Sequence, residues 1–202
     1  PSEGDLPALG FIGLGPKYYN RGRLDVQADE WEDRVDTVTR TFLGLTVACA
    51  RCHDHKYDPI SMTDYYAMAG VFASTQMINK VPGPSPVEES AKEGEEKKKD
   101  TISPDALHMV EDGEIQNLHV FLRGNVERKG PEVKRGFLRV LSEDNSHAFT
   151  SDDSGRKDLA KRIIDPDNPL TARVMVNRLW TMVFGQGLVR TPTNFGALGE
   201  QP

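Results

Sequence analysis

The chain has only two cysteines, Cys49 and Cys52, and His53 follows them directly. A fold stapled by disulfides needs more cysteine pairs and wider loops, so that class of protein is excluded. Four-thiolate zinc and iron–sulfur sites are excluded within these 202 residues, because each needs four cysteines. The chain must therefore fold around a hydrophobic core, and one short segment carries its most distinctive chemistry.

An amphipathic pattern runs into this cysteine pair. Apolar side chains recur at steps of four and three residues, at Trp31, Val35, Val38, Phe42, Leu45 and Cys49. The spacing predicts one continuous helix from about Asp29 to His53, with the stripe on one face. Gly44 lies inside that helix, where it costs about 1 kcal/mol relative to alanine. A close neighbour, such as another helix or a flat ligand, would explain this glycine.

Residues 49–53 have the pattern C-x-x-C-H, which is the attachment signal of c-type haem. Residues three and four apart share one side of a helix, so both thiols can bond to the two vinyl groups on one porphyrin edge. His53 is then placed beneath the iron as its proximal ligand. The motif predicts one covalently attached haem c, held by Cys49, Cys52 and His53.

Three other interpretations of the motif stay open. A redox-active C-x-x-C would follow a strand and begin a helix, whereas here a long helix is expected before it. Zinc would have suitable ligands in Cys49, Cys52, His53 and His55, although four ligands within seven residues would be crowded. In the third interpretation both cysteines are buried and inert.

Other side chains are candidates to complete a haem site. Arg51 and Lys56 flank the motif and can pair with the haem propionates, with solvent-facing charges as the alternative. The candidates for the sixth iron ligand are His108, His119, His147, Met62, Met68, Met77 and Met109. We favour His119, because the strand and turn predicted over 119–125 would hold it in place, whereas Met68 is expected in the core.

Further elements follow from local signals. Ser61, with Asp64 as capping partner, predicts a second helix. A short strand is expected within 117–125 and a modest helix over 157–165. A cap and a proline at 168–169 begin a helix that stops at Gly185. It is apolar on most sides, so we expect it at the centre of a core.

Composition divides the chain. Residues 82–104 include ten charged residues and no aromatic one, so this segment cannot bury enough surface to order itself. We therefore expect a haem-attachment domain at 1–81, a charged linker at 82–104 and a second domain at 105–202. The net charge of −6 argues against nucleic-acid binding, and no apolar run is long enough to span a membrane.

Several longer segments resemble known proteins. Residues 42–75, which begin FLGLTVACARCHDHKYDP, resemble the core of a planctomycete cytochrome-c family domain of unknown function. Residues 117–125, 133–141 and 168–196 resemble the domain that follows it in the same proteins. The resemblance implies an exported protein, periplasmic or at the cell surface, and carries over Cys49, Cys52 and His53 as haem-attachment residues. Family members extend further at both ends, so we expect an internal fragment that contacts the missing parts or other subunits.

These observations predict a mainly α fold: a helical cytochrome-c-like haem module, followed by a mostly helical part with a short β segment. The expected function is electron transfer by a c-type cytochrome module to a redox partner protein. The alternatives are a haem enzyme or sensor with an open, peroxidase-like iron position, and a structural or interaction protein stapled by haem or zinc. Whether the chain is an enzyme stays open.

The charged segment gives a first prediction. Proteases should cut first within 82–104 while the parts on either side stay folded, because this segment has the fewest apolar residues to protect it. Limited proteolysis with mass analysis of the fragments measures the order of cuts. Earliest cuts within 28–74 or 168–185 would contradict the predicted division into domains.

Overall fold

The computed structural model describes residues 8, 10–13, 15, 22–80, 107–142 and 147–201. The predicted linker at 82–104 and both domain boundaries lie outside these residues, so the division into domains stays a prediction. The chain separates into two compact units, residues 1–14 with 76–111 and residues 15–75 with 112–202. In the smaller unit, the described residues form a 3-10 turn, η2 (Phe11–Gly13), and a strand pair made mainly of β1 (Thr75–Lys80) and β2 (Leu107–Asp112).

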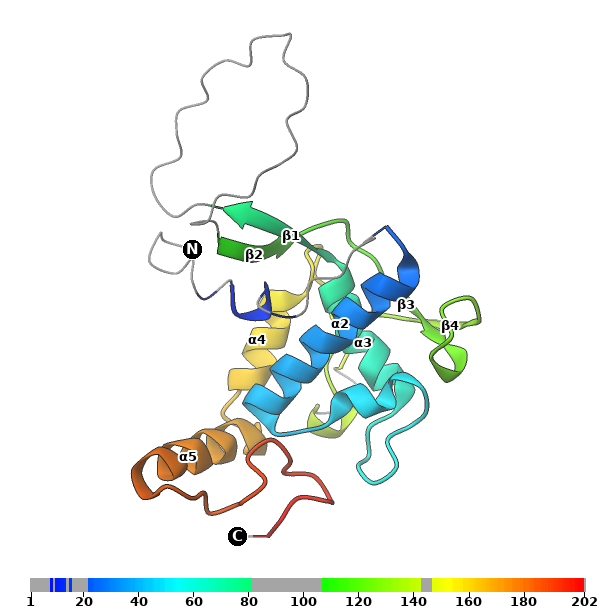
Figure 1. Cartoon of the computed structure of the whole chain (residues 1–202). Helices are drawn as coiled ribbons and strands as arrows, with labels where there is room; N and C mark the ends of the chain where they lie inside the picture. The colour runs from blue at the N-terminus through cyan, green and yellow to red at the C-terminus, as the bar shows by residue number, and fades with distance from the viewer. Residues whose placement is uncertain are drawn as a thin grey trace, which may run out of the picture. The chain divides into compact units, whose positions relative to one another are not determined.

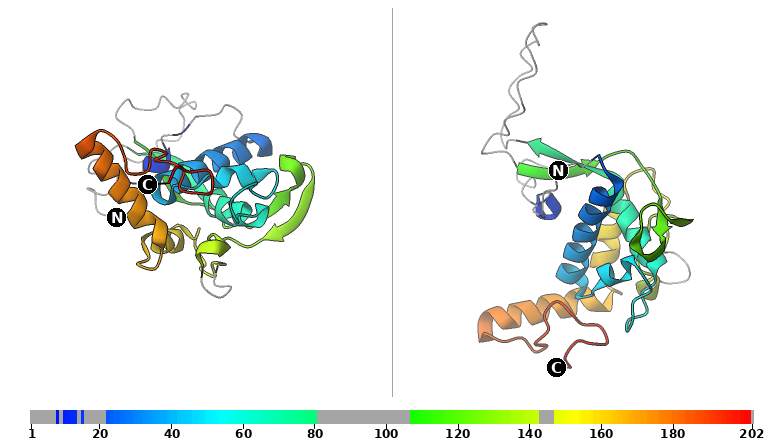
Figure 2. Two further views of the ribbon diagram at one scale, coloured as in Figure 1. Left: turned by 90° about the horizontal axis from the view of Figure 1, so that it is seen from below. Right: turned by 45° about the vertical axis from the view of Figure 1, so that its right-hand side comes forward.

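The larger unit is built on two helices that pack side by side, α2 (Leu24–Val38) and α3 (Met62–Ala73) (Figure 1). An antiparallel hairpin of β3 (Leu118–Phe121) and β4 (Lys129–Val133) packs against α3, with Leu118 opposite Val133. Helix α4 (Arg156–Ile164) also contacts α3. Helix α5 (Pro169–Phe184) reaches the turn that follows α2 (Figure 2).

The core lies between α2 and α3. Helix α2 buries Ala28, Trp31, Val35 and Val38, and α3 buries every residue from Asp64 to Ala73. Among these apolar side chains, the buried Arg34 pairs with Glu30 at 3.5 Å and donates to the carbonyl of Phe72 at 3.4 Å. This arginine ties α2 to the end of α3.

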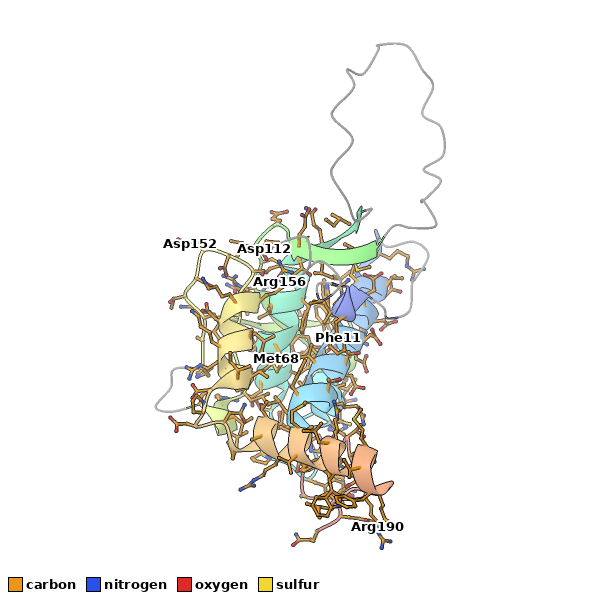
Figure 3. All side chains as sticks on the ribbon, turned by 90° about the vertical axis from the view of Figure 1, so that its left-hand side faces the viewer. Phe11, Met68, Asp112, Asp152, Arg156 and Arg190 are labelled. Atoms are coloured by element: carbon orange, nitrogen blue, oxygen red, sulfur yellow. The ribbon has the colours of Figure 1, made fainter. Side chains whose placement is uncertain are left out.

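At the start of α4, Arg156 pairs with Asp112 at 2.8 Å (Figure 3).

The continuous helix predicted over 29–53 is wrong. Helix α2 ends at Val38, a π-helical turn η3 (Thr39–Leu43) follows, and Gly44 turns the chain with φ of 62°. The motif begins in a separate 3-10 helix, η4 (Val47–Arg51). A Cβ at Gly44 would lie 2.6 Å from the Phe195 ring and 3.0 Å from Val174. The close neighbour expected for this glycine therefore exists, and it is the C-terminal part of the chain.

The predicted stripe is buried as far as Leu45, apart from the half-buried Phe42, while Cys49 is exposed. The second helix is confirmed with its capping box of Ser61 and Asp64. The short strand and the modest helix are confirmed as β3 and α4. Helices predominate in the described chain, but it also holds two small antiparallel sheets, so the fold is mixed. A cytochrome-c-like arrangement stays a prediction.

Helix α5 has the predicted ends but not the predicted burial. Asn168 caps it by accepting from the N–H of Leu170 at 3.0 Å, and Gly185 ends it with φ of 78°. Only Val174 and Asn177 are buried along α5. Most of its other apolar side chains, from Met175 to Phe184, are exposed in the described structure, so its expected place at the centre of a core is wrong. None of the described helices is long and apolar enough to cross a membrane.

Two glycines separate backbone strain from crowding. Gly185 and Gly44 both have positive φ, but a Cβ at Gly185 would meet nothing within 4 Å. Gly185→Ala should lower the free energy of unfolding by about 1–2 kcal/mol, from backbone strain alone. Gly44→Ala should cost about 1–3 kcal/mol more, because its Cβ also displaces Phe195. Urea denaturation of both variants measures the difference, and equal losses would contradict the close packing at Gly44.

Candidate functional site

The motif lies at the surface of the larger unit. Cys49 is within η4, and Cys52 and His53 follow its end. Both cysteines are exposed free thiols, which contradicts the interpretation that they are buried and inert. The chain before η4 is a turn and a loop rather than a strand, so the setting typical of a redox-active C-x-x-C is missing. Both thiols are open to a reaction partner from solvent.

His53 has one ring nitrogen engaged and one available. Its Nδ1 lies 2.7 Å from the carbonyl oxygen of Asp54, and the ring is exposed. Because a carbonyl can only accept, Nδ1 carries the hydrogen in this contact. The lone pair is then on Nε2. Histidines that bind metals are commonly held in this way, with the second ring N–H donated to a carbonyl or carboxylate.

His55, by contrast, is a structural residue. Its Nε2 lies 2.9 Å from the hydroxyl of Thr46, and its Nδ1 accepts from the N–H of Asp58 at 2.9 Å. Both ring nitrogens are thus engaged within the protein. Among the described residues, no three His, Cys, Asp or Glu side chains gather into a group able to hold a metal ion. The zinc interpretation, which needs His55 as a ligand, gains no support from this geometry.

Arg51, between the two cysteines, is held by acids of α2. Its Nη1 lies 2.7 Å from Asp29 and also bonds to Glu32. Burial opposes the charge of Arg51, but the hydrogen bonds that its guanidinium donates to Glu32 and Asp29 outweigh burial and raise its pKa above the ordinary value. The guanidinium is therefore charged and already paired with protein carboxylates, while pairing with a haem propionate stays a prediction.

The exposed Lys56 holds its ammonium 5.1 Å from the centre of the Tyr57 ring. It remains a candidate for pairing with a propionate.

The turn of the β3–β4 hairpin packs against the second cysteine, Cys52. After β3, Arg123 and Gly124 both have positive φ, of 56° and 73°. A Cβ on Gly124 would lie 2.5 Å from the sulfur of Cys52, so the turn approaches this thiol as closely as glycine allows. His119 lies on the same hairpin, half-buried, with Nδ1 3.0 Å from the carbonyl of Gly130. Its role as the sixth ligand stays a prediction.

The other candidate sixth ligands fall elsewhere. Met68 is fully buried in α3, as expected of a core residue. Half-buried His147 follows the hairpin, with no hydrogen-bond partner for Nδ1 among the described residues. The side chains of His108 and Met109 lie outside the described part of the chain.

The chain that leaves the motif is anchored at two places. Asp54 accepts from the first N–H of α3, that of Met62, at 2.8 Å. Asp58 is buried and accepts from the N–H of Ala197 at 2.7 Å. These bonds fix residues 54–62 between α3 and the C-terminal segment.

Sequence reasoning missed the acids that hold Arg51. Asp29 and Glu32 lie 22 and 19 residues before it, so no local motif joins them. The available signal was two acids three residues apart on the helix that leads into the motif, together with an arginine between the cysteines. That pattern indicates a possible pairing but not its geometry.

In comparisons with known proteins, two segments of the chain match family models. Residues 2–77 match the model of PSCyt2, a protein of unknown function (DUF1549), and residues 155–202 match PSD1, a protein of unknown function (DUF1553). Both are planctomycete cytochrome-c-associated domains of unknown function, which confirms the resemblance at that level. No curated protein and no solved structure matches the chain.

The capping box of α3 gives a pH-dependent prediction. Burial alone would raise the pKa of Asp64, but hydrogen bonds from Ser61 and Arg139 outweigh it, so the pKa lies below the ordinary value of 3.8. A depressed pKa stabilises the fold above about pH 4, and this stability is lost as the pH falls through the native pKa. Asp64→Asn should therefore cost about 1–3 kcal/mol at pH 7, and the cost should shrink below about pH 4.

Urea denaturation of the Asp64→Asn variant at a series of pH values measures this cost. The exposed Asp152 (Figure 3) provides the control, because Asp152→Asn should lie within error of the parent at every pH. A cost for Asp64→Asn that stays constant from pH 7 to pH 3 would contradict the stabilising role of the carboxylate.

Proposed function

We propose that this chain is a c-type cytochrome module that binds one haem covalently and transfers electrons. The observation that carries the proposal is the motif geometry: two exposed free thiols and an exposed His53 ring with its Nδ1 bonded to a carbonyl. These are the groups that attachment and axial ligation require.

The residues present fit this cofactor. Each thiol of Cys49 and Cys52 would add across one vinyl group: an S–C bond forms, and the thiol hydrogen passes to the other vinyl carbon, so no oxidant is needed. His53 would offer Nε2 to the iron. The bound haem would supply a one-electron couple, whose potential depends on the axial ligands, burial and hydrogen bonding.

The surroundings of the motif are consistent with this role. Gly124 and its turn leave no room for a side chain on one side of Cys52, so the hairpin can line one edge of the attached group. The proposal includes Lys56 as a cation near the propionates and His119 as the sixth ligand. It also includes export to the periplasm or cell surface and a redox partner protein.

Expression in a host that attaches haem to exported proteins tests the proposal. The intact mass should rise by one haem, and Soret absorption should remain with the polypeptide after acid extraction, because thioether bonds survive denaturation. Cys49→Ala with Cys52→Ala should abolish both signals, and Asp152→Asn, at an exposed residue outside the motif, should leave both unchanged. An unmodified mass for the parent chain would contradict the proposal.

The visible spectrum then separates electron transfer from ligand binding. A six-coordinate, low-spin spectrum that does not respond to cyanide or CO supports the electron carrier. A high-spin spectrum that shifts with either ligand would contradict it and favour an enzyme or sensor with an open iron position. His119→Ala should convert a low-spin spectrum to a high-spin one if this histidine is the sixth ligand.

A further inference from the structure

We propose that Arg51 is a positioning residue of the motif, and that its ion-pair cluster with Asp29 and Glu32 helps to set the reduction potential of the attached haem. The part that concerns the potential rests on the proposed function. The positioning part concerns this chain's own residues and can be tested without haem.

The side chain of Arg51 is fixed at its far end. Its Nη1 lies 2.7 Å from Asp29 and also bonds to Glu32, and the side chain is 15% exposed. Asp29 and Glu32 are one turn apart on α2, where three-residue spacing places them on one face. Because both acids belong to one packed helix, they hold the guanidinium in a single place.

The backbone of Arg51 is fixed independently. The hydroxyl of Tyr66 donates to the Arg51 carbonyl at 3.0 Å and lies 3.4 Å from the carbonyl of Phe121. Tyr66 is 1% exposed, and its ring packs edge-on against Tyr65 and Phe121, with centroids 4.9 and 5.4 Å away. Tyr66 therefore joins the motif to both α3 and β3.

The two residues between the cysteines, Ala50 and Arg51, form a spacer that these contacts hold against the protein. Ala50 is fully buried and Arg51 is held from both ends, while Cys49 and Cys52 on either side are exposed. A spacer anchored in this way presents both thiols to solvent at a fixed separation. Such an arrangement favours the formation of two bonds to one rigid porphyrin edge, because a mobile spacer would have to be ordered during attachment.

The cluster also carries charge beside the motif, because Arg51 lies between the two cysteines. One arginine between two carboxylates leaves an excess of one negative charge beside the motif. Asp29 and Glu32 are 48% and 37% exposed, so water screens part of this charge. A negative charge favours the oxidised iron, which is the more positive form. Removing a carboxylate should therefore raise the potential, and removing the guanidinium should lower it.

Two variants separate this charge effect from simple loosening of the fold. Glu32→Gln removes a negative charge while Asp29 still holds Arg51, so the midpoint potential should rise. Arg51→Gln removes the positive charge, so the potential should fall. A purely structural role predicts that both variants admit water and lower the potential. Redox titration of the haem-bound proteins decides, and a potential that falls or stays unchanged in Glu32→Gln would overturn the charge effect.

A second ion pair, between α2 and the turn η3 that follows it, gives a matched control. Arg40 pairs with Asp36 at 2.7 Å, and no hydrogen bond or ion pair of the described structure joins either side chain to the motif. Arg40→Gln and Asp36→Asn make the same changes of charge. Both should shift the potential less than the corresponding variants at Arg51 and Glu32. Equal shifts would mean that the cluster affects the potential no more than any other ion pair of the protein.

Hydrogen exchange of the haem-free chain tests positioning by itself. Arg51→Gln should speed exchange in residues 47–53 by about tenfold or more, as expected when charged hydrogen bonds are lost. Arg40→Gln should leave this segment unchanged. Equal exchange in parent and Arg51→Gln would overturn the positioning role. A parent without covalent haem would contradict the proposed function and the effect on potential, while exchange would still decide the positioning role.

Discussion

The contact of Phe195 with Gly44 determines where the motif lies. The Phe195 ring occupies the space of a missing Cβ, and the N–H of Phe195 donates to the carbonyl of Gly44 at 2.6 Å. Only a glycine tolerates both this approach and a φ of 62°. The chain therefore leaves the axis of α2 at this point, and η4 brings the cysteines alongside α3 and β3.

Local sequence signals correctly predicted the structural features that depend only on neighbouring residues. The Ser61–Asp64 capping box, the Asn168 cap and the glycine at 185 each act within a few residues, and all three have the expected roles. The break after α2 depends on Phe195, about 150 positions away, and periodicity carries no information about such a partner. The exposed face of α5 shows the same limit, since an apolar pattern indicates that a face can be buried but not what buries it.

The residues of the candidate site also fall into a group that the sequence identified and a group that only the structure shows. The C-x-x-C-H pattern identified Cys49, Cys52 and His53, because the chemistry itself requires that spacing. The supports around these residues come from distant positions: Asp29 and Glu32 on α2, Tyr66 on α3 and Gly124 on the hairpin. Each support is an ordinary residue whose role depends on tertiary geometry. The sequence therefore identified the reactive groups, and the structure was needed to show what holds them.

The segments that match the two family models contact each other on both sides of the motif. Residues 2–77 contain the cysteines, and residues 155–202 contain Phe195 and Ala197. Phe195 packs on Gly44 before the motif, and Ala197 donates to the buried Asp58 after it, at 2.7 Å.

A third bond joins the same two segments, from Arg178 of α5 to the carbonyl of Arg40 at 3.1 Å. The segment that matches the second family model thus contacts the chain on both sides of the cysteines. The carboxylate of Asp58 also lies 3.5 Å from Nδ1 of His55. A shift of the 194–197 segment would therefore move Asp58 and, through it, His55, which is two residues after His53. The segment at 155–202 that matches the second family model is therefore part of the support of the motif, even though it contributes no cysteine.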